Sequence, residues 1–196
     1  MAFDDPEEYM RWYASNPRLY REELELIRRL DLGNCVDVGS GPSVFHEAIS
    51  GAVISLDLSY AMLRAGRPDE DRIQGSALSL PFRNSCLDCI SSIASVMFFK
   101  DLSGFLREAR RVLRPGGTLA ICSIPLDSQL GKVYVEMGRA GDKYYRNASF
   151  LTRDELRSEI GKLFEIEGAS CALEECSFYC VLARKPREPY NGGAEL

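Results

Sequence analysis

The chain has 196 residues, of which 45% are hydrophobic and 27% charged, and its formal net charge is −5. These values are ordinary for one globular domain with a buried core. The acidic balance disfavours a nucleic-acid partner, because phosphate backbones attract proteins with an excess of basic side chains. No apolar stretch reaches the roughly 20 residues that span a bilayer and no signal peptide opens the chain, so we expect a cytoplasmic protein without a membrane span.

The seven cysteines form an odd set. Four of them fall within expected buried strands, where a thiol packs as a small hydrophobe: Cys35, Cys89, Cys122 and Cys180. Cys86 and Cys89 have the spacing of a zinc knuckle or a redox pair, but no second pair or nearby histidine accompanies them. We therefore expect free packing thiols in a reducing compartment, and no metal site.

The first 30 residues open with an aromatic and acidic stretch and continue into a helix expected over residues 17–30. Asn16 is a plausible cap for this helix and Pro17 its first-turn residue. Apolar residues recur along it at intervals of three and four, which predicts one apolar face. We expect that face to cover the edge of a sheet.

Residues 35–43, Cys-Val-Asp-Val-Gly-Ser-Gly-Pro-Ser, indicate a buried strand that ends in a tight turn. Gly39 and Gly41 allow positive φ and let a ligand lie against bare main chain. A helix is expected to follow to about Ile49 and to point its first N–H groups at the same place. A second expected strand ends in Asp57, 20 residues after Asp37, which is the spacing of an acid that accepts hydrogen bonds from ribose hydroxyls. The pattern predicts a nucleoside-binding turn.

Two nucleoside classes are open at this point. A dinucleotide-binding turn has a third glycine three positions after the second, and that position is Val44. Asp37 would also sit badly beside a pyrophosphate, whereas it would suit a cationic ligand. A nicotinamide-dependent oxidoreductase is therefore the weaker alternative.

Two segments carry a resemblance to a known family. Residues 36–41, Val-Asp-Val-Gly-Ser-Gly, and residues 56–63, Leu-Asp-Leu-Ser-Tyr-Ala-Met-Leu, resemble the first two motifs of class I S-adenosylmethionine-dependent methyltransferases. The resemblance is closest to the small-molecule branch that includes ubiquinone/menaquinone methyltransferase-like proteins, and it spans about residues 31–125. It implies an α/β fold, a Rossmann-like doubly wound sheet of about seven strands, with S-adenosyl-L-methionine as cofactor.

The resemblance also implies roles for individual residues. Asp57 would hold the ribose, while Asp37 and the main chain of Gly39 and Gly41 would hold the methionine end. Ser59 would cap a helix whose first turn lies along the adenine. The cofactor-binding residues expected in this way are Asp37, Gly39, Ser40, Gly41, Asp57, Leu58, Met62, Ser76, Ala77, Leu78 and Ser95.

One position departs from the family pattern. Ser76 stands where the family has an acid that accepts a hydrogen bond from the adenine amine. The serine hydroxyl or the Ala77 main chain could meet the adenine instead, and the loss of one charge-assisted hydrogen bond is on the order of 1–3 kcal/mol. Ser76 is also compatible with a non-catalytic S-adenosylmethionine-binding regulatory protein.

Residues 86–94 are expected to form the fourth strand, and the loop after it carries Ser95 and Phe98. Ligands of open α/β sheets bind outside the carboxyl edge, so this loop should line the site. No Asp/Asn-Pro-Pro-Tyr follows the strand, which argues against a methyltransferase for nucleobase amines.

In the second half of the chain, three segments carry clear signals of secondary structure. Residues 101–114 predict a helix that stops at Pro115 and the glycines after it, and they resemble the family segment E-x-R-V-L-x-P-G-G before strand 118–124. Thr152 and Glu155 form a capping box for a helix to about residue 163. Residues 165–173 and 177–185 predict an antiparallel hairpin, which favours a methyltransferase over a dehydrogenase.

We expect one domain over residues 1–196, divided into an N-terminal lid (1–30), a cofactor-binding core (31–125), a substrate-side insertion (126–150), a C-terminal helix and hairpin (151–185) and a tail (186–196). The resemblance implies that the lid folds over the cofactor and the acceptor. The residues expected to contact the substrate, each with ordinary packing as the alternative, are Trp12, Tyr13, Tyr20, Phe98, Tyr134, Tyr144 and Tyr145.

In-line methyl transfer mainly requires alignment of nucleophile and methyl group in a dry pocket. No catalytic acid or base is therefore named, and the acceptor is expected to be an unidentified small molecule.

Overall fold

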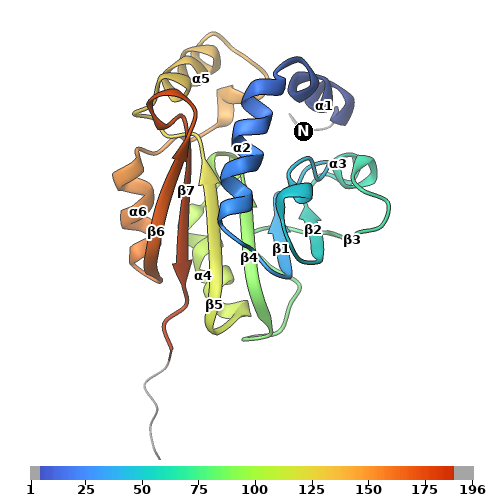
Figure 1. Ribbon diagram of the computed structural model, residues 1–196, viewed down its shortest axis with the longest axis vertical. Coiled ribbons are helices and arrows are strands. Elements are labelled where there is room, and N and C mark those ends of the chain that lie inside the picture. Colours follow the sequence, from blue (N-terminus) through green and yellow to red (C-terminus); the bar gives the residue numbers. More distant parts are fainter. Residues whose placement is uncertain (1–4, 188–196) are drawn as a thin grey trace, which may run out of the picture.

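The structure is a computed structural model that describes residues 5–187 (Figure 1). Its seven strands are β1 Cys35–Val38, β2 Val53–Asp57, β3 Asp71–Gln74, β4 Leu87–Ile93, β5 Leu113–Ser123, β6 Glu165–Ala172 and β7 Phe178–Arg184. They form one sheet in the order β3-β2-β1-β4-β5-β7-β6. Neighbours among β1 to β5 are parallel, whereas β7 is antiparallel to both β5 and β6. The predicted Rossmann-like sheet with a closing antiparallel hairpin is confirmed.

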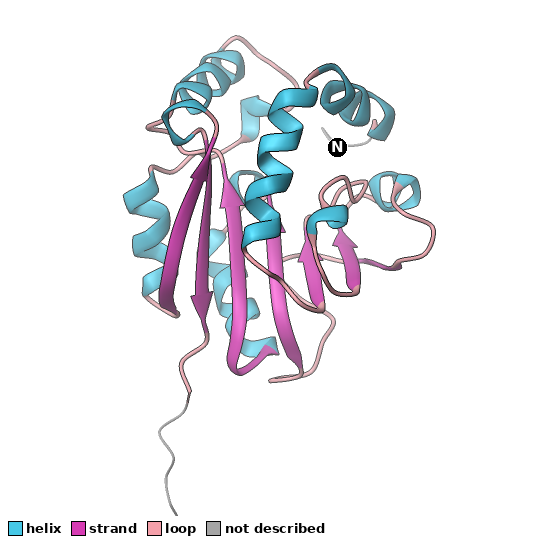
Figure 2. Ribbon diagram, viewed as in Figure 1, coloured by secondary structure: helices cyan, strands magenta, loops and turns pink. Residues whose placement is uncertain are grey.

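Helices cover both faces of this sheet and its carboxyl edge (Figure 2). The α-helices are α1 Pro6–Ser15, α2 Pro17–Arg29, α3 Tyr60–Ala65, α4 Leu102–Val112, α5 Gln129–Arg139 and α6 Arg153–Gly161. Four 3-10 turns are η1 His46–Ala48, η2 Val96–Phe98, η3 Tyr145–Asn147 and η4 Glu174–Cys176. The helix α2 lies across one face of the sheet rather than along its edge as expected, and α4 lies behind the opposite face (Figure 1).

Strand alternation explains the two buried layers. Successive side chains of a strand point to opposite faces. In β5, Ala120 and Cys122 belong to the layer under α2, while Leu119 and Ile121 belong to the layer that packs on α4 and α6. Both layers are apolar because helices cover both faces of the parallel strands.

Two of the helix caps expected from the sequence are present in the structure. Ser59 accepts the N–H of Met62 at the start of α3, and Thr152 and Glu155 form the expected capping box of α6. The side chain of Asn16 makes no capping hydrogen bond to α2.

The helix expected after Gly41 is not formed, and this prediction was wrong. Only the three-residue turn η1 occurs there. Gly41 and Ser43 have φ values of +54° and +60°, with Pro42 between them. Such left-handed residues interrupt α-helical winding.

Three disulfides contradict the expectation of free packing thiols: Cys35–Cys89, Cys122–Cys180 and Cys171–Cys176. The register of β1 and β4 places Val36 beside Ile90, so the preceding Cys35 and Cys89 are neighbours. The register of β5 and β7 places Cys122 opposite Cys180. Cys86 is exposed and free, and Cys89, which has the spacing of a redox partner for it, is bonded to Cys35.

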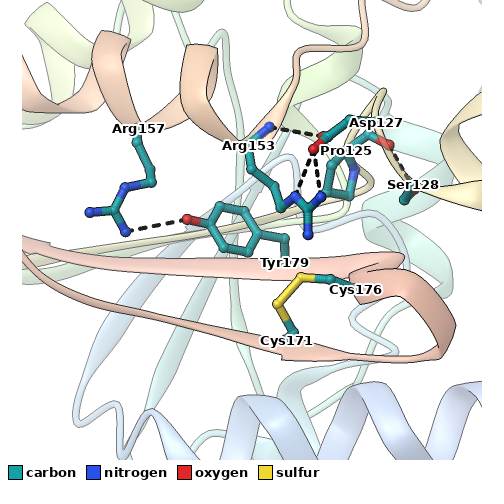
Figure 3. The surroundings of a disulfide bond; sticks show 8 residues. All are labelled: Pro125, Asp127, Ser128, Arg153, Arg157, Cys171, Cys176 and Tyr179. Atoms are coloured by element: carbon teal, nitrogen blue, oxygen red, sulfur yellow. Dashed lines mark hydrogen bonds and ion pairs between the residues drawn. A yellow bond between two sulfur atoms is a disulfide. The ribbon is translucent and has the colours of Figure 1, made fainter.

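The third disulfide closes the turn between β6 and β7 (Figure 3). Near it, the carboxylate of Asp127 accepts hydrogen bonds from the main-chain N–H of Arg153 and from its guanidinium at 2.8 Å. The hydroxyl of Ser128 donates to the Pro125 carbonyl at 2.7 Å. These bonds fasten the start of the segment that carries α5 to the start of α6.

Across residues 5–187, no helix combines the length and the apolar character that crossing a bilayer requires. The same residues contain no group of three or more His, Cys, Asp or Glu side chains arranged to hold a metal ion. The first four residues of the expected lid and residues 188–196 of the expected tail lie outside the described part of the chain.

Candidate functional site

The turn after β1 lies at the carboxyl edge of the sheet. Gly39 and Gly41 have φ values of +76° and +54°. A Cβ on Gly39 would lie 2.7 Å from the Cβ of Ser95, whose hydroxyl donates to the Val38 carbonyl, so Gly39 packs tightly on the loop after β4. A Cβ on Gly41 would meet nothing within 4 Å, so the main chain is open to a ligand there. Ser40, between the glycines, is buried.

Asp57 at the end of β2 holds this turn. Its Oδ2 accepts the N–H of Gly41 at 2.8 Å, and its Oδ1 accepts the N–H of Ser59 at 2.8 Å. Burial raises the pKa of Asp57, and the hydrogen bonds from Ser59 and Gly41 partly oppose that rise. Each carboxylate oxygen has a second lone pair, so the group can also accept hydrogen bonds from two ligand hydroxyls. The structure thus brings together the acid and the glycine turn that the sequence singled out.

Asp37 lies beneath the turn and is 1% exposed. Its Oδ1 accepts the hydroxyl of Ser91 at 2.7 Å, and its Oδ2 is 3.0 Å from Nε2 of His46. The other ring nitrogen of His46 is 2.6 Å from the carboxylate of Glu70. Burial by itself lowers the pKa of His46, but the carboxylates of Asp37 and Glu70 reverse this, and its pKa is raised. A contact of Asp37 with a ligand's methionine end stays a prediction.

The remaining predicted cofactor residues lie around the same edge. Leu58 and Leu78 are 56% and 41% exposed. The hydroxyl of Ser76 accepts the N–H of Leu78 at 3.1 Å, and Ala77 is half-buried beside it. Met62 is fully buried in α3. Contact of Leu58, Leu78, Ser76, Ala77 and Met62 with an adenine stays a prediction.

A cavity of about 130 Å³ lies between α1, α2, the loop after β4 and the segment of α5 and η3. Six of the seven predicted substrate residues line it: Trp12, Tyr13, Phe98, Tyr134, Tyr144 and Tyr145. The seventh, Tyr20, instead donates to the Val44 carbonyl and contacts the carboxylate of Glu47 at 3.0 Å. Contact of the six with a substrate stays a prediction.

The helix α1 is bonded to the segment on the other side of this cavity. Glu8 accepts the hydroxyl of Tyr144 at 2.7 Å and forms an ion pair with Lys143. Tyr13, which is buried, packs edge-to-face on Phe45 with ring centroids 5.3 Å apart. These contacts hold α1 over the cavity, and its role as a lid for cofactor and acceptor stays a prediction.

Sequence reasoning missed Glu23, which lines the cavity and is 2% exposed. Its Oε2 is buried without a hydrogen-bond partner, and burial raises the pKa of its carboxyl group to about 8. A signal was present in the sequence. Glu23 follows Tyr20 by three positions and precedes Ile27 by four, so helical geometry places it on the apolar face of α2, where an acid is out of place.

Tyr9 was also missed, and it lines the cavity. Burial raises the pKa of Tyr9, so its hydroxyl stays protonated near neutral pH. Ala94 lines the cavity as well, and the next residue, Ser95, packs on Gly39. The open turn and the aromatic cavity are therefore neighbouring parts of one site.

A family model and several curated relatives carry the name methyltransferase. The family model described as "Methyltransferase domain" matches residues 36–121. An uncharacterised protein of Methanocaldococcus jannaschii is 30% identical over 159 residues, which are 80% of this chain and 77% of that protein. The demethylmenaquinone methyltransferase of Mycolicibacterium vanbaalenii is 36% identical over 126 residues, which are 61% of this chain and 54% of that enzyme. The chain thus spans about half the length of the demethylmenaquinone methyltransferases it matches.

A solved structure shares the fold. It is a Thermotoga maritima protein described as an S-adenosylmethionine-dependent methyltransferase, possible histamine N-methyltransferase. Its TM-score is 0.82 at 23% identity, and the match covers 94% of this chain and 98% of that one.

Proposed function

The chain belongs to the class I S-adenosylmethionine-dependent methyltransferases of the small-molecule type. We propose that it methylates a small molecule held in the aromatic cavity. S-adenosylmethionine is its cofactor, and when bound it supplies a methyl group activated by a positively charged sulfur. The observation that carries the proposal is the pairing of an open glycine turn, held by Asp57, with a cavity beside it.

The residues around the turn fit this cofactor. Asp57 keeps one lone pair on each oxygen for the ribose hydroxyls while it holds Gly41 and Ser59. The open main chain at Gly41 leaves room for the methionine end. Leu58 and Leu78 offer apolar contact for the adenine.

The cavity has the properties that methyl transfer requires of an acceptor site. It lies against the loop after β4, and most of its lining side chains are aromatic. A pocket of this kind can align the acceptor with the methyl group, and alignment supplies much of the acceleration in such a displacement.

The names of the demethylmenaquinone methyltransferases make a demethylated quinone one acceptor to test. Because the chain spans about half of those enzymes, the quinone belongs in a panel beside phenols, thiols and amines. Incubation with cofactor labelled in the methyl group, followed by mass spectrometry of each acceptor, identifies the substrate class. Tight cofactor binding without transfer to any acceptor would instead indicate a regulatory S-adenosylmethionine-binding protein.

The cofactor site is tested with Asp57→Ala. We expect S-adenosylmethionine affinity, measured by titration calorimetry, to fall at least tenfold, which is about 1.4 kcal/mol, because two ribose hydrogen bonds to a charged acceptor are lost. Asp88→Ala is the matched control, because Asp88 is an exposed acid in β4 that pairs with Arg114. Equal affinity of the two variants would remove Asp57 from the site.

A further inference from the structure

The carboxylate of Glu23 is the unexplained group of the cavity. Its side chain is almost completely buried, and Oε2 has no hydrogen-bond partner. Buried polar atoms are almost always hydrogen-bonded, because an unpaired one loses its interactions with water and gains none. A cavity borders this carboxylate, so its partner can arrive with a ligand.

The walls around Glu23 are aromatic. Tyr134 and Tyr145 stack with ring centroids 4.2 Å apart, and Trp12 packs edge-to-face on Tyr13 at 4.9 Å. The faces of such rings are negative, and they attract ammonium groups, most strongly where water is excluded.

The charges at the cavity point to a cation as well. The described lining residues include two acids, Glu8 and Glu23, and no lysine, arginine or histidine. Glu8 is already neutralised by its ion pair with Lys143 and its hydrogen bond from Tyr144. Glu23 is therefore the lining acid that a cationic ligand can ionise and pair with, whereas the described lining offers an anionic ligand no cationic side chain.

We propose that the cavity binds the methyl acceptor as an organic ammonium ion, with the Glu23 carboxylate as its ion partner and the surrounding rings as its walls. This substrate class rests on the proposed function. The volume of about 130 Å³ is close to that of an engineered protein cavity of about 150 Å³ that holds benzene. The acceptor is therefore an amine about as large as a single ring.

The protonation states of the groups that face the cavity support this assignment. With the cavity empty, burial raises the pKa of Glu23 to about 8, so its carboxyl group is mostly protonated near pH 7. The pKa of Glu8 is lowered by Lys143 and Tyr144. Burial raises the pKa of all five lining tyrosines, which therefore stay neutral: Tyr9, Tyr13, Tyr134, Tyr144 and Tyr145. Glu23 is thus the lining group that ionises between about pH 6 and about pH 9.

The bound ammonium must lose a proton before its nitrogen can act as a nucleophile. The Glu23 carboxylate accepts that proton and leaves a neutral amine, and it returns the proton to solvent after product release. In the transfer itself the N–C bond forms as the C–S bond breaks, and the electron pair of the broken bond stays on sulfur. The products are an N-methylammonium ion and a neutral thioether.

The binding experiment compares benzylammonium with benzyl alcohol and benzoate, which share its ring but differ in charge. Trp12 is the chain's one tryptophan and lines the cavity, so its fluorescence reports occupancy directly. We expect benzylammonium to bind most tightly, and Glu23→Gln to weaken it at least tenfold without changing benzyl alcohol affinity. Glu25→Gln is the matched control, because Glu25 is an exposed acid on the same helix, and it should bind like the natural chain.

A second readout detects the proton. Calorimetry near pH 7 in two buffers of different ionisation enthalpy should show close to one proton released per benzylammonium bound, and none in Glu23→Gln. If that variant does not fold, the natural chain alone decides, since its affinity for benzylammonium should rise roughly 50-fold from about pH 6 to about pH 8 as Glu23 ionises. A flat pH profile, equal affinity of Glu23→Gln, or a preference for benzyl alcohol or benzoate would overturn the proposal.

The outcomes separate this inference from the proposed function. S-adenosylmethionine affinity measured on Glu23→Gln should equal that of the natural chain, because Glu23 lies in the acceptor cavity. If the natural chain did not bind S-adenosylmethionine, the proposed function would be refuted. Amine binding at Glu23 would still stand as a measured property of the cavity.

Discussion

At the scale of single residues, His46 has the most unusual surroundings. It is buried between the carboxylates of Asp37 and Glu70, with Ser55 also donating to Glu70 at 3.2 Å. Burying charges is costly unless they are paired and hydrogen-bonded, and each partner here has at least two such contacts. The network joins the end of β1 to η1 and to the segment before β3. It therefore fixes the end of β1, from which the glycine turn begins.

His46 is the chain's one histidine, so its ring proton signal in an NMR titration needs no assignment. We expect a midpoint above its ordinary value of 6.5, because the carboxylates of Asp37 and Glu70 outweigh the effect of burial. A raised pKa means that this ion network stabilises the fold fully below about pH 6.5 and loses its effect as pH rises through the folded-state pKa.

Glu70→Gln should lower that midpoint, since it removes one of the two charges. Glu47→Gln, at an exposed acid beside His46, should leave it nearly unchanged. A midpoint at or below 6.5 in the natural chain would contradict the charged network.

Glu23 shows how far residue-scale reasoning from sequence can go. Its position on the apolar face of α2 was readable from helical spacing. Its unpaired Oε2 was not, because the absence of a partner depends on every element packed around the cavity.

At the scale of elements, the two glycines of the turn between β1 and η1 have different structural roles. Gly39 and Gly41 both have positive φ, but they differ in how much space a side chain would have at each position. Gly39 faces Ser95 at a distance that no side chain tolerates, whereas Gly41 faces open space. Gly39 is required for close packing against Ser95, whereas Gly41 leaves the main chain accessible to a ligand.

This difference predicts opposite profiles for two alanine variants. Gly39→Ala should lower the free energy of unfolding by about 2–4 kcal/mol, the sum of left-handed strain and overpacking against Ser95. Gly41→Ala should cost only about 1–2 kcal/mol of strain but weaken S-adenosylmethionine binding at least tenfold, because its methyl group occupies the open side. Urea unfolding and calorimetry measure the two effects, and normal cofactor binding by Gly41→Ala would be the contrary result.

Local sequence signals predicted most elements correctly. Capping residues and apolar periodicity indicated α4 and α6, and alternation indicated the hairpin of β6 and β7. They failed after Gly41, where the left-handed residues Gly41 and Ser43 and the burial of His46 replaced a helix with η1. Tertiary contacts of His46 outweighed local propensity there.

At the scale of the whole molecule, two of the disulfides join segments far apart in sequence. Cys35 and Cys89 are separated by 54 positions, and Cys122 and Cys180 by 58. In the chain-entropy account, closing loops of this length stabilises the fold by about 4 kcal/mol each. Together with the hairpin bond they tie β1 to β4, β5 to β7, and β6 to its turn.

The bonding pattern is tested by counting thiols in the urea-unfolded chain. One thiol, that of Cys86, should react without reductant, and all seven should react after reduction. Reduction should also lower the free energy of unfolding by several kcal/mol, because both long loops are released. Seven reactive thiols before reduction would show that the cysteines are unpaired.

Sequence patterns alone were enough to predict the Rossmann-like sheet with its closing hairpin, the glycine turn with Asp57 placed 20 residues after Asp37, and the family to which the chain belongs. These features depend on local spacing and on neighbouring residues, which a linear chain displays. Only the tertiary structure decided the cysteine pairing, the buried network of His46 and the isolation of Glu23 in its aromatic cavity. Each of these depends on strand register and helix packing between distant segments, and local patterns do not encode those distances.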